Sequence, residues 1–272
     1  MNVERILLRE EEKEQEHVVG HREKLKIGII GISSGAGASF MAMSLAKALS
    51  KMKKGGVAVV ELGDASIYDS MGMDKRFAGR TFFSFYNAVN KGESIRGKTN
   101  MDEGINWILR VPHETDIAYN LAYKLRLIDN AVGDFILCDF SGEPIPVSGE
   151  SEEEGGNWKS TKLLLEDMDH LIIIVDPMPS KMMKGYKILV KLRSHEIQLP
   201  VTYVINKYNG GVNKKEMTEF LRIRRFMPIP HVDPEDVYQA EYNCKSPYSI
   251  ERAQKKLAEP IEKLISIIDE KL

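Results

Sequence analysis

A glycine- and serine-rich loop carries the clearest chemistry in this sequence of 272 residues. Residues 31–39 read GISSGAGAS and follow an apolar run that begins at Leu25. Glycines let consecutive backbone N–H groups turn toward one point, and the N-terminus of a following helix adds about half a positive charge. Such loops bind phosphate groups. The predicted phosphate-binding residues are Ser34, Gly35, Ala36, Gly37, Ala38, Ser39 and Phe40.

Two positions in the loop decide how strongly a nucleotide would bind. Ser39 falls where the P-loop pattern places a hydroxyl that ligates Mg²⁺, and Gly37 falls on the last glycine of the pattern. Between them the pattern requires lysine, whereas this sequence has Ala38. A lysine–phosphate contact is worth about 1.5–3 kcal/mol, so its loss is expected to weaken binding roughly 10- to 150-fold without abolishing it.

Alternating apolar runs and helical patterns supply the elements that must hold this loop. A helix is expected at Ser39–Lys51, where apolar residues recur at helical spacing. Strands separated by helices predict βαβ units, and hence an α/β fold with a mainly parallel sheet and helices on both faces. The predicted strands are residues 25–32, 56–62, 106–111, 134–138, 170–175 and 200–205.

The pattern divides the chain into a charged N-terminal arm, residues 1–24, and one α/β domain, residues 25–272. Within the domain, residues 144–160 are acidic and lack an apolar period, which predicts an exposed loop. Residues 260–272 place Ile261, Leu264, Ile265, Ile268 and Leu272 on one helical face. We expect this face to dock on the domain, because the opposite face mixes acids with lysines and does not suit a membrane surface.

Composition excludes several classes of protein. The chain is 43% hydrophobic and 29% charged with a net charge of −2, which excludes a disordered chain and a globally basic nucleic-acid binder. Its two cysteines, Cys138 and Cys244, cannot form a disulfide framework. The first residues lack the pattern of a secretory signal, and no apolar run approaches the ~20 residues that span a bilayer. A cytoplasmic protein without a transmembrane segment is expected, with Cys138 inert in a buried strand.

The loop and the motifs after it resemble the ParA/MinD family of P-loop proteins, whose loop is written K-G-G-x-G-K-[ST]. The resemblance extends from Leu25 to about Ile250 and implies the P-loop NTPase architecture of the SIMIBI class. The motifs follow in the family's order: VAVVELGD (57–64) as its second strand, DFILCD (134–139) as its Walker B strand, HLIIIVDP (170–177) as its next strand, VINKYN (204–209) with its strand-end Asn, and MPIP (227–230).

This resemblance implies roles for three residues beyond the loop. Asp139 stands where a carboxylate reaches the Mg²⁺ shell through water, and Gly142 stands in a D-x-x-G arrangement whose N–H can sense a γ-phosphate. Asn206 stands at the Asn that hydrogen-bonds adenine, and Asn209 replaces the Asp that a guanine reader would need. The implied cofactor is therefore ATP or ADP with Mg²⁺, and Ser39 and Asp139 are its metal-binding residues.

Three charged positions of the family carry uncharged residues here, namely Ser33, Ala38 and Gly63. Ser33 stands at the signature lysine, which in the family crosses a dimer interface, and Ala38 stands at the ordinary P-loop lysine. Glu61 and Gly63 stand at the two aspartates of a D-x-D motif, with Asp64 one residue late. Because contacts of the arginine-finger kind are worth about 10³–10⁵ in rate, hydrolysis is expected to be absent or very slow. No catalytic residue is assigned.

Residues 181–225 form a basic segment with a net charge of +8. Four lysines recur at helical spacing and predict one stripe, which is either a solvated face or a footprint for DNA or an acidic partner. The candidate surface consists of Lys181, Lys184, Lys187, Lys191, Arg222, Arg224 and Arg225.

The family resemblance and the altered loop together predict a degenerate ParA/MinD-like protein. Its expected role is that of a positioning or regulatory scaffold in cell organisation, with a homodimeric state and a protein partner. Two alternatives stay open. One is an active partitioning-type ATPase that takes its cation from elsewhere in the chain, and the other is a nucleotide-independent module that binds DNA or a partner through residues 181–225.

Overall fold

The computed structural model describes residues 24–114, 120–143, 156–194 and 198–269. Within these ranges eight strands form one sheet in the order β3-β4-β2-β5-β1-β6-β7-β8. Neighbouring strands are parallel except β3 and β4. β1 lies between β5 and β6, so the chain leaves it near the middle of the sheet's C-terminal edge. The strands are β1 Leu25–Gly31, β2 Val57–Glu61, β3 Met101–Asp102, β4 Ile105–Ile108, β5 Phe135–Asp139, β6 His170–Val175, β7 Val201–Tyr208 and β8 Met227–Pro230.

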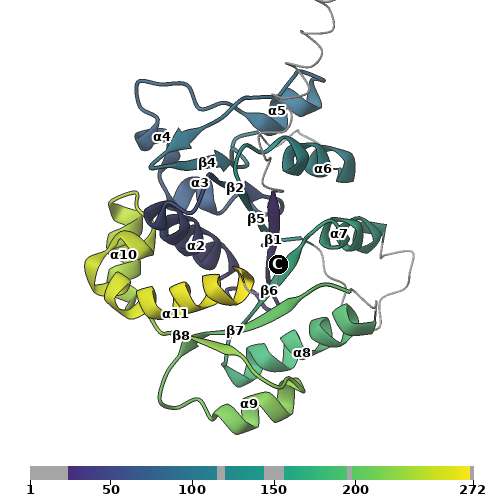
Figure 1. Ribbon diagram of the computed structural model, residues 1–272, viewed down its shortest axis with the longest axis vertical. Coiled ribbons are helices and arrows are strands. Elements are labelled where there is room, and N and C mark those ends of the chain that lie inside the picture. The colour runs from purple at the N-terminus through teal and green to yellow at the C-terminus, as the bar shows by residue number, and fades with distance from the viewer. Residues whose placement is uncertain (1–23, 115–119, 144–155, 195–197, 270–272) are drawn as a thin grey trace, which may run out of the picture.

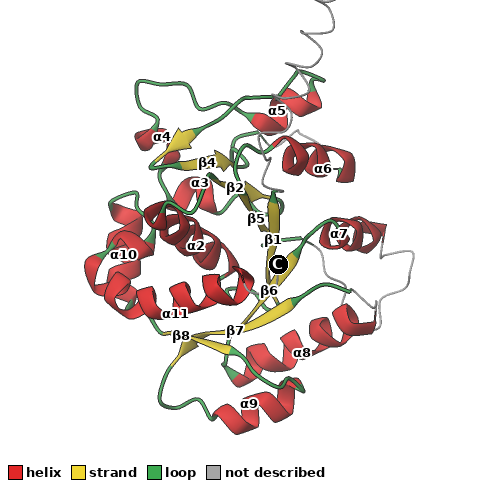
Figure 2. Ribbon diagram, in the orientation of Figure 1, coloured by secondary structure: helices red, strands yellow, loops and turns green. Residues whose placement is uncertain are grey.

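Helices cover both faces of the sheet (Figures 1 and 2). One core cluster lies under α2 and α11, and a second lies under α5 to α9 on the other face. This architecture confirms the predicted α/β fold class. The helices are α2 Ala38–Met52, α3 Ile67–Ser70, α4 Met73–Arg76, α5 Phe85–Asn90, α6 Leu121–Asn130, α7 Gly156–Glu166, α8 Pro179–Ser194, α9 Lys214–Leu221, α10 Pro234–Tyr242 and α11 Glu251–Asp269, with a 3₁₀ turn η1 at Pro247–Ser249.

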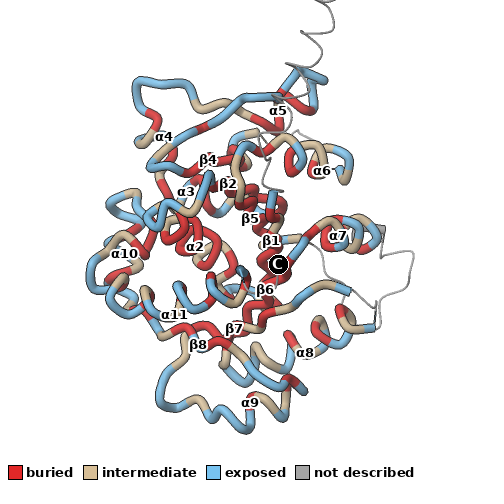
Figure 3. The backbone as a smooth tube through the Cα atoms, viewed as in Figure 1, coloured by how far each residue is buried: buried red, intermediate tan, exposed pale blue. Residues whose placement is uncertain are grey.

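Most of the inner strands are buried along their whole length (Figure 3). Every residue of β2, β5 and β6 is buried, as expected for parallel strands that are covered on both faces. The predicted strand at residues 170–175 is confirmed as β6, and Cys138 is buried in β5. Burial raises the pKa of the Cys138 thiol, in keeping with its predicted inertness.

The predicted acidic loop at residues 144–160 is wrong at its C-terminal end. Residues 156–160 form the first turns of α7, whereas residues 144–155 lie outside the described ranges. The predicted N-terminal arm, apart from Lys24, and Leu272 also lie outside them. Trp158, Thr161, Leu164 and Leu165 lie at helical spacing and are buried. The apolar face of this helix begins inside the predicted loop. The acidic residues directly before it show no helical period of apolar residues, so the sequence pattern does not indicate where the helix starts.

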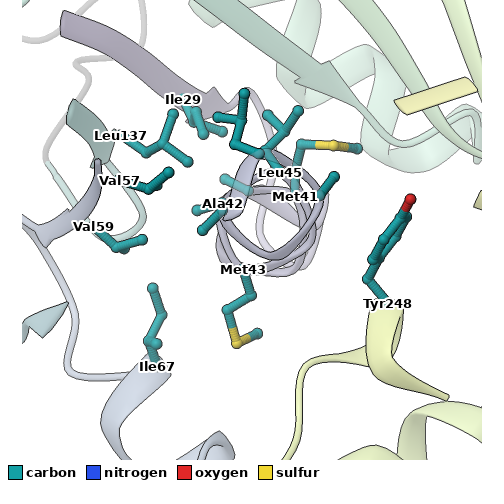
Figure 4. Packing of buried hydrophobic residues seen from close by; sticks show 14 of the residues in the cluster. Ile29, Met41, Ala42, Met43, Leu45, Val57, Val59, Ile67, Leu137 and Tyr248 are labelled. Atoms are coloured by element: carbon teal, nitrogen blue, oxygen red, sulfur yellow. The ribbon is translucent and has the colours of Figure 1, made fainter. Parts of the chain in front are cut away.

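α2 connects the loop to the core (Figure 4). In this view Ala42 points toward Val57 and Val59 of β2, and Met43 points toward Ile67 of α3. Met41, Ala42 and Leu45 are buried almost completely. This packing fixes the N-terminus of α2, and therefore the loop before it, relative to the ends of β2 and β5.

The C-terminal helix α11 docks on the domain, as predicted. It begins before Pro260 and buries one face against α2, η1 and β8. The buried side chains of this helix are Ala253, Leu257, Ile261, Leu264, Ile265 and Ile268. Among the helices of the described ranges, none has the length and apolar character needed to cross a bilayer.

Truncation of a buried side chain on α11 tests this docking. Leu264 is 0% exposed, so Leu264→Ala is expected to lower the free energy of unfolding by about 2–5 kcal/mol. The exposed neighbour Lys263→Ala provides the matched control in urea denaturation. A loss below about 0.5 kcal/mol for Leu264→Ala would show that the helix is not docked in solution.

Candidate functional site

The predicted phosphate loop lies between β1 and α2. Gly35 and Gly37 have φ angles of +69° and +100°, which residues with a side chain rarely adopt. Gly37 is the N-cap of α2 and forms no side-chain cap. The first N–H groups of α2 are therefore available to an anion, which the positive end of the helix dipole also attracts.

The loop forms one wall of a cavity of about 430 Å³. This volume lies within the range of small-molecule sites, and the cavity is at the C-terminal edge of the parallel strands, where α/β proteins bind ligands. The other walls come from residues after β2, residues after β5, and α8. The cavity is lined by Gly31, Ser33, Ser34, Gly35, Ala36, Gly37, Ala38, Ser39, Phe40, Asp64, Ser66, Ser141, Gly142, Glu143 and Ile188.

Two buried polar atoms at this cavity have no hydrogen-bond partner within the described part of the chain. They are Oγ of Ser33, which lines the cavity, and Oδ2 of Asp139, the last residue of β5, whose other carboxylate oxygen accepts from the lining residue Ser141. Leaving a polar atom buried and unpaired costs about 1–3 kcal/mol. Unpaired atoms of this kind call for an explanation, and a polar ligand in the cavity provides one.

Ser39 and Asp139 are linked through Ser141. The Ser39 hydroxyl donates to Oγ of Ser141 at 3.0 Å, and Ser141 donates from N and Oγ to Oδ1 of Asp139 at 3.0 and 2.7 Å. Burial raises the pKa of Asp139. A serine hydroxyl close to a carboxylate oxygen without a partner is an all-oxygen donor set, which fits Mg²⁺ and its water shell. Ser39 and Asp139 are thus the residues that would hold this ion.

Glu61 is the second buried carboxylate at this edge of the sheet. It is 0% exposed, and its Oε1 accepts from the backbone N–H groups of Ser66 and Ile67, both at 2.7 Å. Burial raises the pKa of Glu61 to about 8 despite these hydrogen bonds. Glu61 is therefore mostly protonated at neutral pH and secures the chain after β2.

This shift predicts a pH dependence of stability. Because the pKa of Glu61 is about 8 in the folded protein against an ordinary 4.5, the folded state keeps a proton that the unfolded chain releases between these values. The contribution of Glu61 to the free energy of unfolding is fully present below pH 4.5 and is lost as the pH rises to about 8. The loss is at most about 1.4 kcal/mol per pH unit. Melting temperatures in EDTA should fall more steeply with pH for the wild type than for Glu61→Gln. Parallel profiles would contradict this assignment.

The carboxylate expected at the second family aspartate is one residue further along the chain. A Cβ at Gly63 would overlap with the backbone of Ser141, so only glycine fits there. The next residue, Asp64, donates its N–H to O of Ser141 at 2.8 Å, and its carboxylate lies beside Gly142 and lines the cavity. The close contact between the two chain segments therefore moves the carboxylate from position 63 to position 64.

Asn206 lies beneath the loop. Its side chain is 5% exposed and donates to O of Ala36 at 2.8 Å, and a Cβ on Gly37 would overlap with its amide nitrogen. The amide thus holds the loop in this structure. Its predicted hydrogen bond to adenine stays a prediction.

The predicted basic stripe on α8 divides into two parts. Lys184 and Lys187 are exposed, whereas Lys181 pairs with the buried Asp176 at 3.2 Å, next to the loop. The sequence pattern predicts Lys181 as part of the stripe and gives Asp176 and Lys207 no role at the loop, because only the fold brings the two lysines to Gly35 and Asp176 to both of them.

Three arginines of the candidate basic surface, Arg222, Arg224 and Arg225, are exposed. They follow α9, whose last turn is close to the end of α8, because Arg193 donates to O of Leu221 at 2.9 Å. The structure therefore brings the exposed basic residues of the two helices onto neighbouring elements.

A second cavity of about 430 Å³ lies between the start of α8 and α9. Four methionines line it, Met178, Met182, Met183 and Met217. Its only charged lining residue within the described ranges is Glu216. This apolar and weakly acidic lining does not suit a phosphate group.

Solved structures with this fold include three from partition and division proteins. A plasmid partition protein from Borrelia burgdorferi B31, bound to AMPPNP, is 19% identical, with 89% of this chain and 98% of that chain covered and a TM-score of 0.63. A ParA-family ATPase from Chlorobium tepidum TLS is 18% identical over 89% and 99% of the two chains, with a TM-score of 0.64. MinD from Pyrococcus horikoshii OT3, complexed with Mg-ADP, is 16% identical over 92% and 99%, with a TM-score of 0.63.

The sequence itself matches no protein-family model and no curated protein. The likeness to these structures confirms that the chain has the ParA/MinD-type P-loop fold.

Proposed function

We propose that the chain binds ATP or ADP with Mg²⁺ in the loop cavity and acts as a positioning or regulatory scaffold with weak or no hydrolysis. The observation that carries this proposal is the pair of unpartnered buried atoms, Oγ of Ser33 and Oδ2 of Asp139, at a cavity walled by an anion-binding loop. The solved structures of this fold that contain AMPPNP and Mg-ADP support the choice of ligand. A cytoplasmic location, a homodimer and a protein partner belong to the same proposal.

Each part of the cavity has a role in this proposal. The N–H groups of residues 34, 35 and 37–40 bind the phosphates, whereas that of Ala36 donates to O of Ser33 at 3.0 Å, and Ser39 and Asp139 hold Mg²⁺. Gly142, at φ +77°, presents its N–H where a terminal phosphate can be sensed. Bound Mg²⁺ neutralises phosphate charge, which the loop alone does only in part.

Weak hydrolysis follows from the small side chains in the loop. Ala38 lines the cavity with a methyl group, and Ser33 offers a neutral hydroxyl. Neither supplies a positive charge to the transition state of phosphoryl transfer. One feature favours the second candidate, a partitioning-type ATPase: the carboxylate of Asp64 lies in the cavity even though position 63 is glycine.

Calorimetric titration of Mg-ATP and Mg-ADP into the full chain, with a parallel phosphate-release assay, tests the proposal. Micromolar affinity that depends on Mg²⁺, with phosphate release far below about 1 s⁻¹, is the expected result. Absence of heat at millimolar nucleotide would overturn nucleotide binding. Release at about 1 s⁻¹ or faster would instead favour the ATPase.

DNA binding is a further candidate that the exposed basic residues of α8 and α9 favour. Affinity for duplex DNA is then expected to fall steeply with salt, and neutralising Lys184, Lys187 and Arg224 together should lower the slope of log K against log salt by about 3. A control variant in which the exposed Lys255 and Lys263 of α11 are neutralised should keep the wild-type slope. Fluorescence anisotropy measures the affinity of each variant. An affinity that does not change between 50 and 200 mM salt would exclude this candidate.

A further inference from the structure

Two lysines from outside the loop flank Gly35. Lys207 of β7 donates from Nζ to O of Gly35 at 2.8 Å. Nζ of Lys181, in the first turn of α8, lies 3.3 Å from the point that a Cβ on Gly35 would occupy. Ammonium groups therefore stand beside a loop whose own lysine positions, 33 and 38, carry serine and alanine.

A single carboxylate holds both lysines. Asp176 has a side chain that is 1% exposed, and its Oδ2 lies 2.8 Å from Nζ of Lys207 and 3.2 Å from Nζ of Lys181. Oδ1 of Asp176 accepts from the backbone N–H of Met178 at 3.1 Å, which fixes the carboxyl group. Two ammonium groups that share one carboxylate leave this cluster with a net positive charge next to Gly35.

The backbone of β7 is irregular where it approaches the loop. The register with β8 shifts between Ile205 and Tyr208, and Lys207 adopts φ +56°, which is costly for a residue with a side chain. Successive side chains of a regular strand point to opposite faces. The irregularity lets both Asn206 and Lys207 donate to carbonyls of the loop. Bulges and strained residues of this kind concentrate at functional sites, where they redirect side chains.

Lys181 is less firmly held than Lys207. Within the described part of the chain its ammonium group pairs with Asp176 alone, at 3.2 Å, whereas that of Lys207 also donates to O of Gly35. It lies at the N-terminal end of α8, where the helix dipole disfavours a cation. Ile188, two turns further along α8, lines the cavity, so Lys181 lies on the helix face that is turned toward the loop. Its flexible stem can carry the ammonium group from Asp176 to the rim of the cavity.

We propose that Lys181 is a phosphate-binding residue, and that its ammonium group leaves Asp176 for the phosphate chain of a nucleotide bound in the loop. Lys207 and Asp176 are positioning residues that keep the loop and Lys181 in place. This inference rests on the proposed function, because it identifies the cation of the same nucleotide site. Lys181 then supplies from α8 a positive charge that binds the phosphates, in place of the P-loop lysine that Ala38 replaces.

Matched lysine variants on α8 test this proposal. Calorimetric titration of Mg-ATP is compared for the wild type, Lys181→Gln and Lys184→Gln, the last of which removes an exposed lysine one turn further along. Lys181→Gln is expected to bind roughly 10- to 150-fold more weakly, and Lys184→Gln within twofold of the wild type. Equal affinities of the two variants would overturn the role of Lys181 while leaving the proposed function intact. Failure of the wild type to bind would instead overturn the proposed function.

A rescue variant separates loss of charge from damage to the fold. Lys181→Gln combined with Ala38→Lys returns a positive charge to the loop, and this double variant is expected to recover most of the lost affinity. Lys181→Gln should also melt within a few degrees of the wild type, because the side chain is exposed by more than a third. Loss of affinity in Lys181→Gln without recovery in the double variant would contradict a charge-based role.

Discussion

Replacing Asp139 by alanine is expected to remove the Mg²⁺ dependence of nucleotide binding. Asp139 is 0% exposed, its Oδ2 has no hydrogen-bond partner within the described part of the chain, and its Oδ1 accepts from Ser141, which contacts Ser39. Loss of a residue that orders a metal shell typically costs 10- to 100-fold in metal affinity, so affinity for Mg-ATP should fall by about that factor. Binding of ATP in EDTA should change little. Calorimetry with and without Mg²⁺ measures both.

The same substitution should not destabilise the free protein severely. A buried carboxylate oxygen without a partner lowers the stability of the folded state. Its removal therefore offsets part of the stability that is lost with the packing of the side chain. Asp129→Ala, at an exposed aspartate, provides the control. If the ratio of affinities with and without Mg²⁺ stays the same in Asp139→Ala as in the wild type, Asp139 does not act on the ion.

Gly37→Val is expected to abolish nucleotide binding, with a loss of at least 100-fold in affinity. Gly37 has φ +100°, and a Cβ there would overlap with the Asn206 amide that holds the loop. The valine must therefore displace Asn206 or the loop, and either change disorders the N–H groups that face the phosphates.

Gly79→Val is the matched control, because Gly79 has φ +87° with no atom within 4 Å of an added Cβ. Both variants carry a similar backbone penalty of about 1–2 kcal/mol, but only Gly37→Val changes the loop. Fluorescence titration with a labelled ATP analogue should show binding by Gly79→Val and none by Gly37→Val. Wild-type affinity in Gly37→Val would place the nucleotide elsewhere.

The sequence predicts the fold well where strands are buried on both faces. β6 at His170–Val175 coincides with its apolar run, because every residue in it is buried. The edge strands β3 and β8 are not predicted, because strands of two and four residues are too short to show an alternation of apolar and polar residues. In addition, β8 contains Pro228 and Pro230, and proline is typical of edge strands and not of a strand interior. The start of α7 is not predicted either, because the acidic residues before it carry no apolar period from which the helix could be extended.

The candidate site is predictable only in part. The sequence places the loop and Asp139 at the same edge of the sheet, since the loop follows a parallel strand, β1, and Asp139 ends another, β5; the structure shows that these strands are adjacent. The approach of Lys181 to Gly35 depends on how α8 packs, which no local pattern specifies. Helical spacing alone predicts only that Lys181 belongs to a basic stripe on this helix. The carboxylate is at position 64 and not at position 63 because the chain at these residues contacts the backbone of Ser141, a residue far away in sequence.

Backbone amide NMR of the full chain, recorded during titration with Mg-AMPPNP, shows directly whether the loop binds the nucleotide. We expect the largest chemical-shift changes at residues 34–40 and at residues 139–142, with saturation at micromolar ligand. Smaller shifts should occur at Lys207, whose ammonium group holds the loop. Shifts confined to the methionine-lined cavity between α8 and α9, or the absence of shifts at millimolar ligand, would contradict a nucleotide site in the loop.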